Sequence, residues 1–165
     1  MSSSGVLVSQ DCLETYQKLG KELRYIIFMI EDKEVKVDVA KRQDELSEQQ
    51  EDAFADNSRA AYEEFCADLK ARTNELQDCR YCVFDFKFKA NRGAAGAANA
   101  NKIAFLQVCP DGSPVRQKML YASSASAIKV ALGIPVSAQF QVNDEAGLSH
   151  SERLAVILEK FSDKQ

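Results

Sequence analysis

The sequence has no tryptophan, and it contains only one histidine, three prolines and seven glycines among its 165 residues. Its longest clear apolar run, residues 25–30 (YIIFMI), is far shorter than the roughly 20 residues that a membrane-spanning helix needs. Residues 1–4 (MSSS) are polar and lack the charged and apolar regions of a secretory signal peptide. These absences argue against a membrane-spanning protein and lead us to expect a cytoplasmic one.

The single histidine also removes most catalytic patterns that depend on an imidazole base. His150 stands beside serines and acids at the expected start of the last helix, so we interpret it as a capping or surface residue rather than a general base. The segment from Gly93 to Gly96 has neither the Gly-Lys-Ser/Thr of a phosphate-binding loop nor the G-x-G-x-x-G of a dinucleotide site. We therefore expect no enzymatic activity, no cofactor and no metal.

Five cysteines, an odd number, are scattered along the chain, which is typical of reduced intracellular thiols rather than a disulfide scaffold: Cys12, Cys66, Cys79, Cys82 and Cys109. Cys79 and Cys82 lie in a predicted strand, where positions three apart point to opposite faces and cannot share a zinc ion. No histidine near Cys109 in the sequence could activate it. We predict buried, unreactive thiols, and a cytosolic thiol-dependent enzyme remains the alternative.

Charge is unevenly distributed, although the net charge is only −4. Residues 1–85 carry 19 acidic and 11 basic side chains, whereas residues 86–143 carry one acidic side chain and seven basic ones: Lys87, Lys89, Arg92, Lys102, Arg116, Lys118 and Lys129. This basic stretch indicates an acidic partner, either a protein or an anionic membrane surface. Nucleic acid is disfavoured, because no recognition helix or aromatic stacking motif accompanies the charges. A solvated basic face without a partner is the alternative.

Hydrophobic periodicity predicts one mixed α/β domain. Helical spacing covers residues 6–19, 59–76, 114–132 and 149–161, and strand patterns cover residues 24–30, 34–40, 79–89, 102–108 and 134–142. Residues 43–58 hold six acids and no base, which is typical of a solvated loop. Within the single domain of residues 1–165 we expect a mobile N-terminal tail at residues 1–5 and a flexible Ala/Gly-rich hairpin tip at residues 91–101.

The start of the long third helix carries the clearest binding signal. Ser113 is predicted to cap it and Pro114 to occupy its first position. Arg116 and Lys118 follow in the first turns, where the positive end of the helix dipole makes an exposed cation unfavourable by about 0.3–1 kcal/mol. Together with the apolar Met119 they suit an acidic cleft with a hydrophobic floor. The alternative is an unoptimised surface.

Motifs along nearly the whole chain resemble the ADF/cofilin family of actin-depolymerising proteins. The resemblance is carried by Ser4-Gly5-Val6, by residues 25–28, 79–86 and 102–105, and above all by Pro110-Asp111, Pro114-Val115-Arg116, Lys118-Met119 and Tyr121-Ala122-Ser123-Ser124. It implies a central mixed β-sheet flanked by helices on both faces, a monomer that binds monomeric and filamentous actin in the cytoskeleton, and no catalysis. A divergent module that binds an actin-related protein is the alternative.

The resemblance also implies two binding surfaces. The monomer-binding surface carries over to Ser4, Gly5, Val6, Arg116, Lys118, Met119 and Lys129. The filament-side surface carries over to Lys102, Arg92, Asp144 and Lys160. It further implies inhibitory phosphorylation at Ser4, with Ser2 and Ser3 as possible substitutes, and competition between actin and phosphoinositide membranes for Lys102, Arg116, Lys118 and Lys129.

Several positions depart from the family pattern. Ala100 stands where some relatives have a base, and Ala125 stands where a Lys is common. Ala155-Val156 stand where some relatives have an acid and a base, unless Glu159-Lys160 is the true match after a gap. Fewer cations on the filament side predict weak severing and favour monomer sequestration.

Overall fold

A computed structural model describes residues 5–46, 54–135 and 139–161. Its centre is a six-stranded sheet in the order β1-β3-β2-β4-β5-β6. The strands are β1 (Leu7–Val8), β2 (Leu23–Glu31), β3 (Glu34–Arg42), β4 (Arg80–Asn91), β5 (Ala97–Val108) and β6 (Gln139–Val142). The two outer pairs, β1 with β3 and β5 with β6, are parallel and the inner pairs are antiparallel, so the sheet is mixed.

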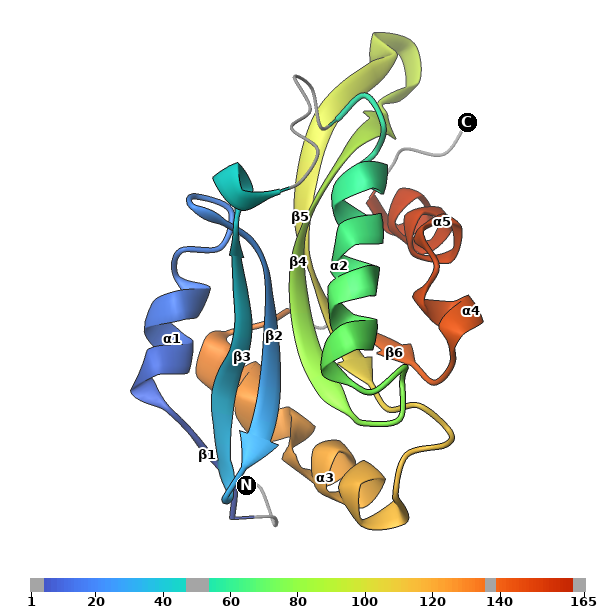
Figure 1. Ribbon diagram of the computed structural model, residues 1–165. Helices are drawn as coiled ribbons and strands as arrows, with labels where there is room; N and C mark the ends of the chain where they lie inside the picture. Colours follow the sequence, from blue (N-terminus) through green and yellow to red (C-terminus); the bar gives the residue numbers. More distant parts are fainter. Residues whose placement is uncertain (1–4, 47–53, 136–138, 162–165) are drawn as a thin grey trace.

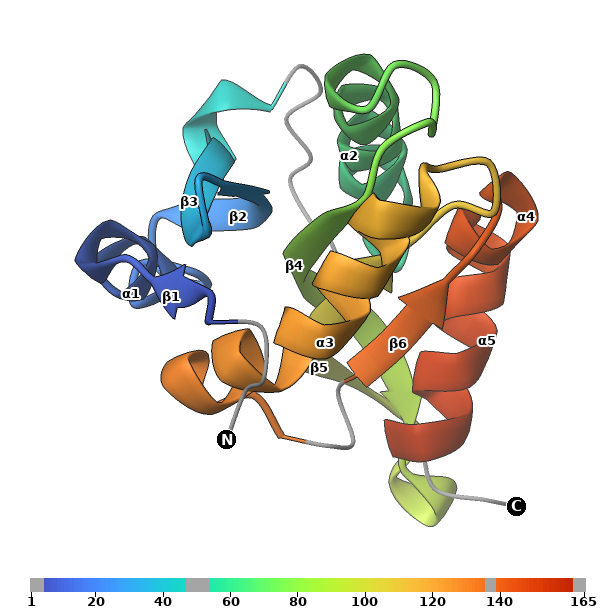
Figure 2. The ribbon, with the colours of Figure 1, turned by 90° about the horizontal axis from the view of Figure 1, so that it is seen from below.

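Helices cover both faces of this sheet, as expected (Figures 1 and 2). The helices are α1 (Gln10–Tyr16), α2 (Arg59–Arg72), α3 (Val115–Leu132), α4 (Glu145–Leu148) and α5 (His150–Phe161), with short 3-10 turns η1 (Gln43–Glu45) and η2 (Gly93–Ala95). Side chains of α2, α4 and α5 pack on one face, and those of α1 and α3 pack on the other. None of the helices within the described ranges is both long and apolar enough to cross a membrane.

The central strand β4 explains why there are two cores. Its residues alternate between the faces: Phe84 and Phe86 belong to the cluster under α2 and α5, whereas Tyr81 and Val83 belong to the cluster under α3. All four side chains are fully buried. A strand buried on both faces is apolar at nearly every position, which is why this segment reads as a strong strand from the sequence.

The beginning of the chain differs from the expected helix at residues 6–19. Leu7 and Val8 instead form β1, beside Glu34 and Val35 of β3. The helix starts only after Ser9, whose side chain accepts a hydrogen bond from the backbone N–H of Cys12. Val6 and Leu7 can serve a helix or a strand equally well in the sequence, and the free edge of β3 decides for a strand.

The β4–β5 hairpin is paired almost to its end. The ladder runs from Arg80 opposite Val108 to Asn91 opposite Ala97, so only residues 92–96 form the turn. Most of the tip expected at residues 91–101 is therefore strand. Backbone hydrogen bonds hold this ladder, and they need no large side chain from the Ala/Asn-rich segment. The hairpin projects beyond the helices at the end of the molecule away from α3 (Figure 1).

Helix α3 begins one residue later than expected and ends where expected. Pro114 occupies the N-cap position, and no side chain, that of Ser113 included, caps the helix. Gly133 closes it in the left-handed conformation with φ of 73°, which glycine adopts without the strain that a Cβ brings. Ile134 follows directly, and the expected strand at residues 134–142 is reduced to β6; residues 136–138 lie outside the described residues.

Candidate functional site

Helix α3 presents an exposed apolar stripe to solvent. Val115 is 66% exposed, Met119 66% and Val130 81%, and the helical periodicity places the three on one side of α3. The opposite side of the helix is buried through Tyr121, Ala125 and Ile128. A helix with apolar residues on both sides needs a second partner to cover the exposed one.

Cations flank this apolar stripe. Arg116 is exposed and, within the part of the chain that the structure describes, it has no hydrogen-bonding or ionic partner. The ammonium of Lys118 donates to the backbone oxygen of Asp111 at 3.0 Å, and that of Lys129 donates to Oε1 of Gln139 at 2.9 Å. By helical periodicity Arg116 lies on one side of the stripe and the two lysines on the other. The sequence-predicted residues of α3 therefore form one surface.

The N-terminal segment adds to this surface. Strand β1 contacts α3, and Leu7 within it is 70% exposed. Gly5 is exposed too, with φ of 73°. Val6, expected at the surface, is instead buried at 5% exposure in the core beneath α3. Ser4 lies outside the described residues. We call Gly5, Leu7, Val115, Arg116, Lys118, Met119, Lys129 and Val130 the α3 surface.

An open pocket of about 440 Å³ borders the α3 surface. The end of β2 contributes Met29 and Ile30 to its wall, and α3 contributes Arg116 and Leu120. Tyr121 lines it as well, and its hydroxyl accepts a hydrogen bond from the backbone N–H of Ile30 at 2.8 Å. The α3 surface therefore combines an exposed apolar stripe with an open pocket beside it.

Residues expected on the filament side lie apart from the α3 surface. Lys102, Ala104 and Leu106 occupy every second position of β5, so their side chains lie on the same face of the sheet. That face is the one that α2 and α5 cover, opposite to α3. The C-terminal end of α5, which carries Lys160, lies beside the projecting hairpin that carries Arg92 (Figures 1 and 2). The basic stretch of the sequence is therefore split into two groups, one on the hairpin and one on α3.

Intramolecular contacts already engage several of these filament-side groups. The Lys160 ammonium lies 4.9 Å from the centroid of the Phe140 ring. The guanidinium of Arg153, a second cation of α5, lies 5.3 Å from the same centroid. Asp144 is the N-cap of α4, and its carboxylate accepts from the backbone N–H of Gly147 at 2.7 Å. Of the positions that depart from the family pattern, Ala125 is buried in the core, so it does not contribute to either surface.

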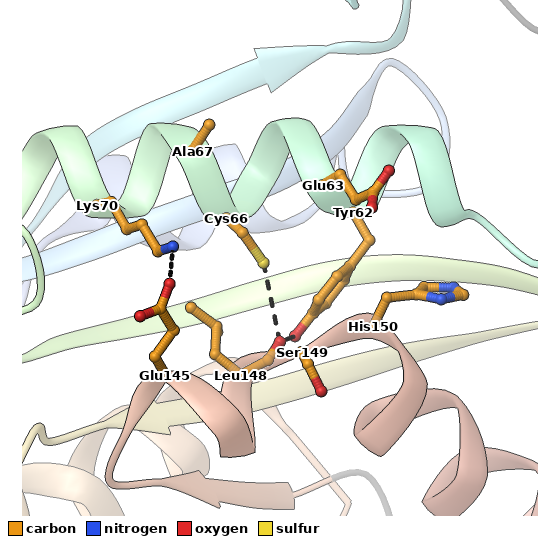
Figure 3. A pocket seen from close by; sticks show the side chains of 9 residues that line it. All are labelled: Tyr62, Glu63, Cys66, Ala67, Lys70, Glu145, Leu148, Ser149 and His150. Atoms are coloured by element: carbon orange, nitrogen blue, oxygen red, sulfur yellow. Dashed lines mark hydrogen bonds and ion pairs between the residues drawn. The ribbon is translucent and has the colours of Figure 1, made fainter.

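A pocket of about 380 Å³ lies between α2 and the α4–α5 corner and contains Cys66 and the only histidine of the chain (Figure 3). The Cys66 thiol points to the backbone oxygen of Leu148 at 3.8 Å, and burial raises its pKa to about 12. His150 lies at the far end of the pocket from Lys70, with its ring stacked on Phe86 and Nε2 bonded to the Asn57 backbone oxygen. This arrangement keeps the thiol protonated at neutral pH and gives no support to a thiol-dependent enzyme.

The other cysteines occupy the interior, with one feature that the sequence did not indicate. Cys79 and Cys82 belong to different cores, which confirms that they point to opposite faces of the sheet. Cys79 instead lies near Cys109 in the core under α3, because the two residues flank the paired positions Arg80 of β4 and Val108 of β5. No spacing rule reveals this pair, because only the register of β4 against β5 brings the two residues together. No group of three or more potential metal ligands occurs in the described ranges.

The sequence is similar to those of actin-depolymerising factors and cofilins. The family model for cofilin/tropomyosin-type actin-binding proteins matches residues 5–157. The chain is 50% identical over 155 residues to actin-depolymerizing factor 1, isoforms a/b, of Caenorhabditis elegans, which covers 92% of this chain and 73% of that protein. It is 33% identical over 162 residues to a cofilin of Mycosarcoma maydis, covering 97% of this chain and 96% of that protein.

Solved structures agree with the sequence relatives. The solution structure of the ADF-like UNC-60A protein of Caenorhabditis elegans is 49% identical, with a TM-score of 0.81, and the match covers 98% of this chain and 99% of that one. The crystal structure of Streptomyces griseoflavus cofilin is 30% identical, with a TM-score of 0.65, and the match covers 92% of this chain and 98% of that one. The fold and the sequence motifs therefore point to the same relatives.

Proposed function

We propose that this chain, which belongs to the cofilin/tropomyosin-type actin-binding family, binds an actin monomer through the α3 surface. Membership of this family makes it an actin-binding protein that promotes actin depolymerisation. The observation that supports the location of the site is the exposed apolar stripe of Val115, Met119 and Val130 between unburied cations. Stability of the isolated chain requires neither feature.

The exposed stripe and the cations at the start of α3 both lower the stability of the free chain, which supports a role in binding. Each exposed large side chain on the stripe forgoes about 1.5–3 kcal/mol that full burial would contribute. Arg116 and Lys118 stand close to the positive end of the helix dipole, where each costs about 0.3–1 kcal/mol. An acidic partner with an apolar floor would bury the stripe and neutralise the cations together. Ser4 directly precedes Gly5 in the sequence, and we include it in the proposed site.

We further propose that the chain works by binding alone, as a monomer in the cytoplasm, without catalysing a covalent reaction. Its family is an actin-binding one, and the protonated Cys66 and the engaged His150 support this view.

Replacing Arg116 and Lys118 together by alanine is expected to weaken actin-monomer binding at least tenfold, which corresponds to about 1.4 kcal/mol or more. The fold should remain, because removing two cations from the first turns of α3 relieves unfavourable dipole interactions. Fluorescence titration of labelled actin monomers and thermal melting measure the two quantities. The matched control, Arg59→Ala with Lys70→Ala on α2, removes the same charge from the other face of the sheet and should bind normally. Unchanged affinity in the Arg116/Lys118 variant would show that the site lies elsewhere.

Phosphorylation at Ser4 is expected to inhibit monomer binding. A phosphate adds about 1.5–2 negative charges at neutral pH and would repel the acidic surface that the α3 cations attract. Ser4→Glu should therefore bind actin monomers more weakly than the native chain, and Ser4→Ala should bind as well as the native chain. The same titration measures both variants, and a Ser4→Glu chain with native affinity would contradict the proposal.

Phosphoinositide membranes are expected to compete with actin for the α3 surface. Arg116, Lys118 and Lys129 lie on that surface, whereas Lys102 lies on the opposite face of the sheet, so we assign the main membrane contact to the three α3 cations. Each basic residue near an anionic membrane contributes about 1 kcal/mol, and salt screens this attraction. Vesicle co-sedimentation should fall steeply between low and high salt and should fall in the Arg116/Lys118 variant. Binding that ignores salt would indicate an apolar mode of attachment instead.

Filament severing is expected to be weak compared with depolymerisation or monomer sequestration. Lys160, the filament-side cation of α5, lies over the Phe140 ring, and leaving an aromatic ring costs an exposed cation about 0.5–1 kcal/mol. The hairpin contributes Lys102 beside Ala100 and an Ala/Gly-rich end. Single-filament microscopy should count fewer cuts per length and time than for a strongly severing relative at matched binding density. Equal cutting rates would show that the filament-side surface is fully competent.

A further inference from the structure

The pocket beside the α3 surface lies where the pairing of two central strands ends. Strand β2 pairs with β4 only through residues 25–28, which lie opposite residues 81–84. Beyond that point β2 continues through Met29 and Ile30, and the backbone N–H of Ile30 donates to the hydroxyl of Tyr121 on α3. An open space of about 440 Å³ remains between the end of β2, the start of β4 and α3. We call it the β2–α3 pocket; its lining includes Met29, Ile30, Asp78, Arg80, Arg116 and Leu120.

Two sets of intramolecular contacts fix the walls of this pocket. Arg80 is only 9% exposed, its Nε donates to Oδ2 of Asp38 at 3.1 Å, and its Nη2 donates to the backbone oxygen of Arg72 at 2.8 Å. On the α3 side, the amide nitrogen of Gln117 donates to Oδ1 of Asp78 at 3.2 Å. The pocket is therefore formed in the free chain, and a partner does not have to order these side chains when it binds.

The apolar part of the lining is accessible to solvent. Met29, Ile30 and Leu120 are each partly exposed. Ile30 and Leu120 also pack against the core under α3, whereas Met29 belongs to neither core of the described residues. Protein interfaces bury the anchoring side chains of a partner in pockets of this kind, and the volume is within the range of about 300–1,000 Å³ that is usual for ligand pockets. The β2–α3 pocket can therefore hold a large apolar side chain.

The charges of the lining determine which neighbour that apolar side chain should have. Arg80 and Arg116 are its two cations, and Asp78 is its one acid. Arg80 is already paired with Asp38. Arg116 is exposed and has no hydrogen-bonding or ionic partner among the residues that the structure describes. A guanidinium binds a carboxylate through two parallel hydrogen bonds, so the pocket fits an apolar side chain that has an acidic one beside it.

We propose that the β2–α3 pocket binds an apolar side chain of the actin monomer and that Arg116 binds a carboxylate next to it. Arg116 belongs both to the pocket and to the α3 surface, so a partner that covers the apolar stripe of α3 also reaches the pocket. This inference rests on the proposed α3 surface and extends it to β2. It makes Met29, which no sequence motif singled out, a specificity-determining residue.

Charge substitutions at Met29 test for the acid beside the anchoring side chain. Met29→Glu and Met29→Lys remove the same side chain and add opposite charges. Met29→Glu should weaken actin-monomer binding at least tenfold, because it repels the carboxylate at Arg116, whereas Met29→Lys should weaken it about threefold or less. High salt should reduce the difference between them. Fluorescence titration measures affinity, and thermal melting checks that both variants fold.

The matched control is the same pair of substitutions at Ala71. This residue is exposed on α2, on the other face of the sheet. Ala71→Glu and Ala71→Lys change the net charge of the chain as the Met29 variants do. Both should bind actin monomers as the native chain does.

The Met29→Lys variant also identifies the acid of the partner. A carbodiimide joins a lysine amine to a carboxylate in contact with it, forming an amide bond with the loss of water. Peptide mass spectrometry of this variant, cross-linked to actin monomers, should find the introduced lysine joined to an Asp or Glu that has a large apolar side chain beside it on the actin surface. Cross-links through Lys118 serve as the internal control, and this readout does not require Met29→Glu to fold.

The possible results separate the pocket from the α3 surface. Equal affinities of the two Met29 variants, or cross-links through Lys118 but none through position 29, would overturn the pocket and leave the α3 surface in place. Native actin affinity of Met29→Glu together with a loss of binding to phosphoinositide vesicles would also overturn it, because a lipid headgroup would then be the occupant. Native affinity of the Arg116/Lys118 variant would overturn the α3 surface and the role of Arg116 with it.

Discussion

The fold depends on one strand that is buried on both faces and paired along both edges. Strand β4 joins β2 on one side and β5 on the other, and its side chains alternate between the core under α2 and α5 and the core under α3. A slip of one residue would exchange the two sets of side chains, so Phe84 would face α3 and Val83 would face α2. The strict alternation therefore determines which helices lie on which face. It also positions α3, because the hydroxyl of Tyr81 donates to the backbone oxygen of Tyr121 within that helix.

This layout separates the charges of the chain into two places with different properties. The cations of α3 flank an exposed apolar stripe, and Arg116 points to solvent without an intramolecular partner in the described residues. The cations of α5 rest on the Phe140 ring, and Asp144 caps α4. A partner can therefore bind the α3 surface without breaking many intramolecular contacts. A partner of the filament-side surface must replace the contacts that Lys160 and Asp144 already make. This difference is the basis of our proposal that the protein binds actin monomers more strongly than filament sides.

Much of the fold was predictable because local chemistry and tertiary packing agree. Strands β2, β3 and β4, helix α2 and the end of α3 at Gly133 appear close to where periodicity placed them. The disagreements arise where small or ambiguous residues leave the choice to neighbours. Leu7 and Val8 became a strand because β3 has a free edge, and residues 97–101 became a strand because β4 provides a backbone partner. Arg116, Lys118 and Met119 lie together on the surface of α3, as the sequence predicted, but Val6 is buried and the exposure of Val130 was not predicted.

The sequence by itself determined the family, the mixed α/β class and the cations at the start of α3, because each of these is written in short motifs or in local periodicity. Only the tertiary structure decided which residues from distant segments meet. It divided one basic stretch into two surfaces, since the β4–β5 hairpin and α3 extend to opposite ends of the molecule (Figure 1). It also placed Cys79 near Cys109, thirty positions away in the sequence, because strand register, and not spacing along the chain, sets which residues lie opposite each other.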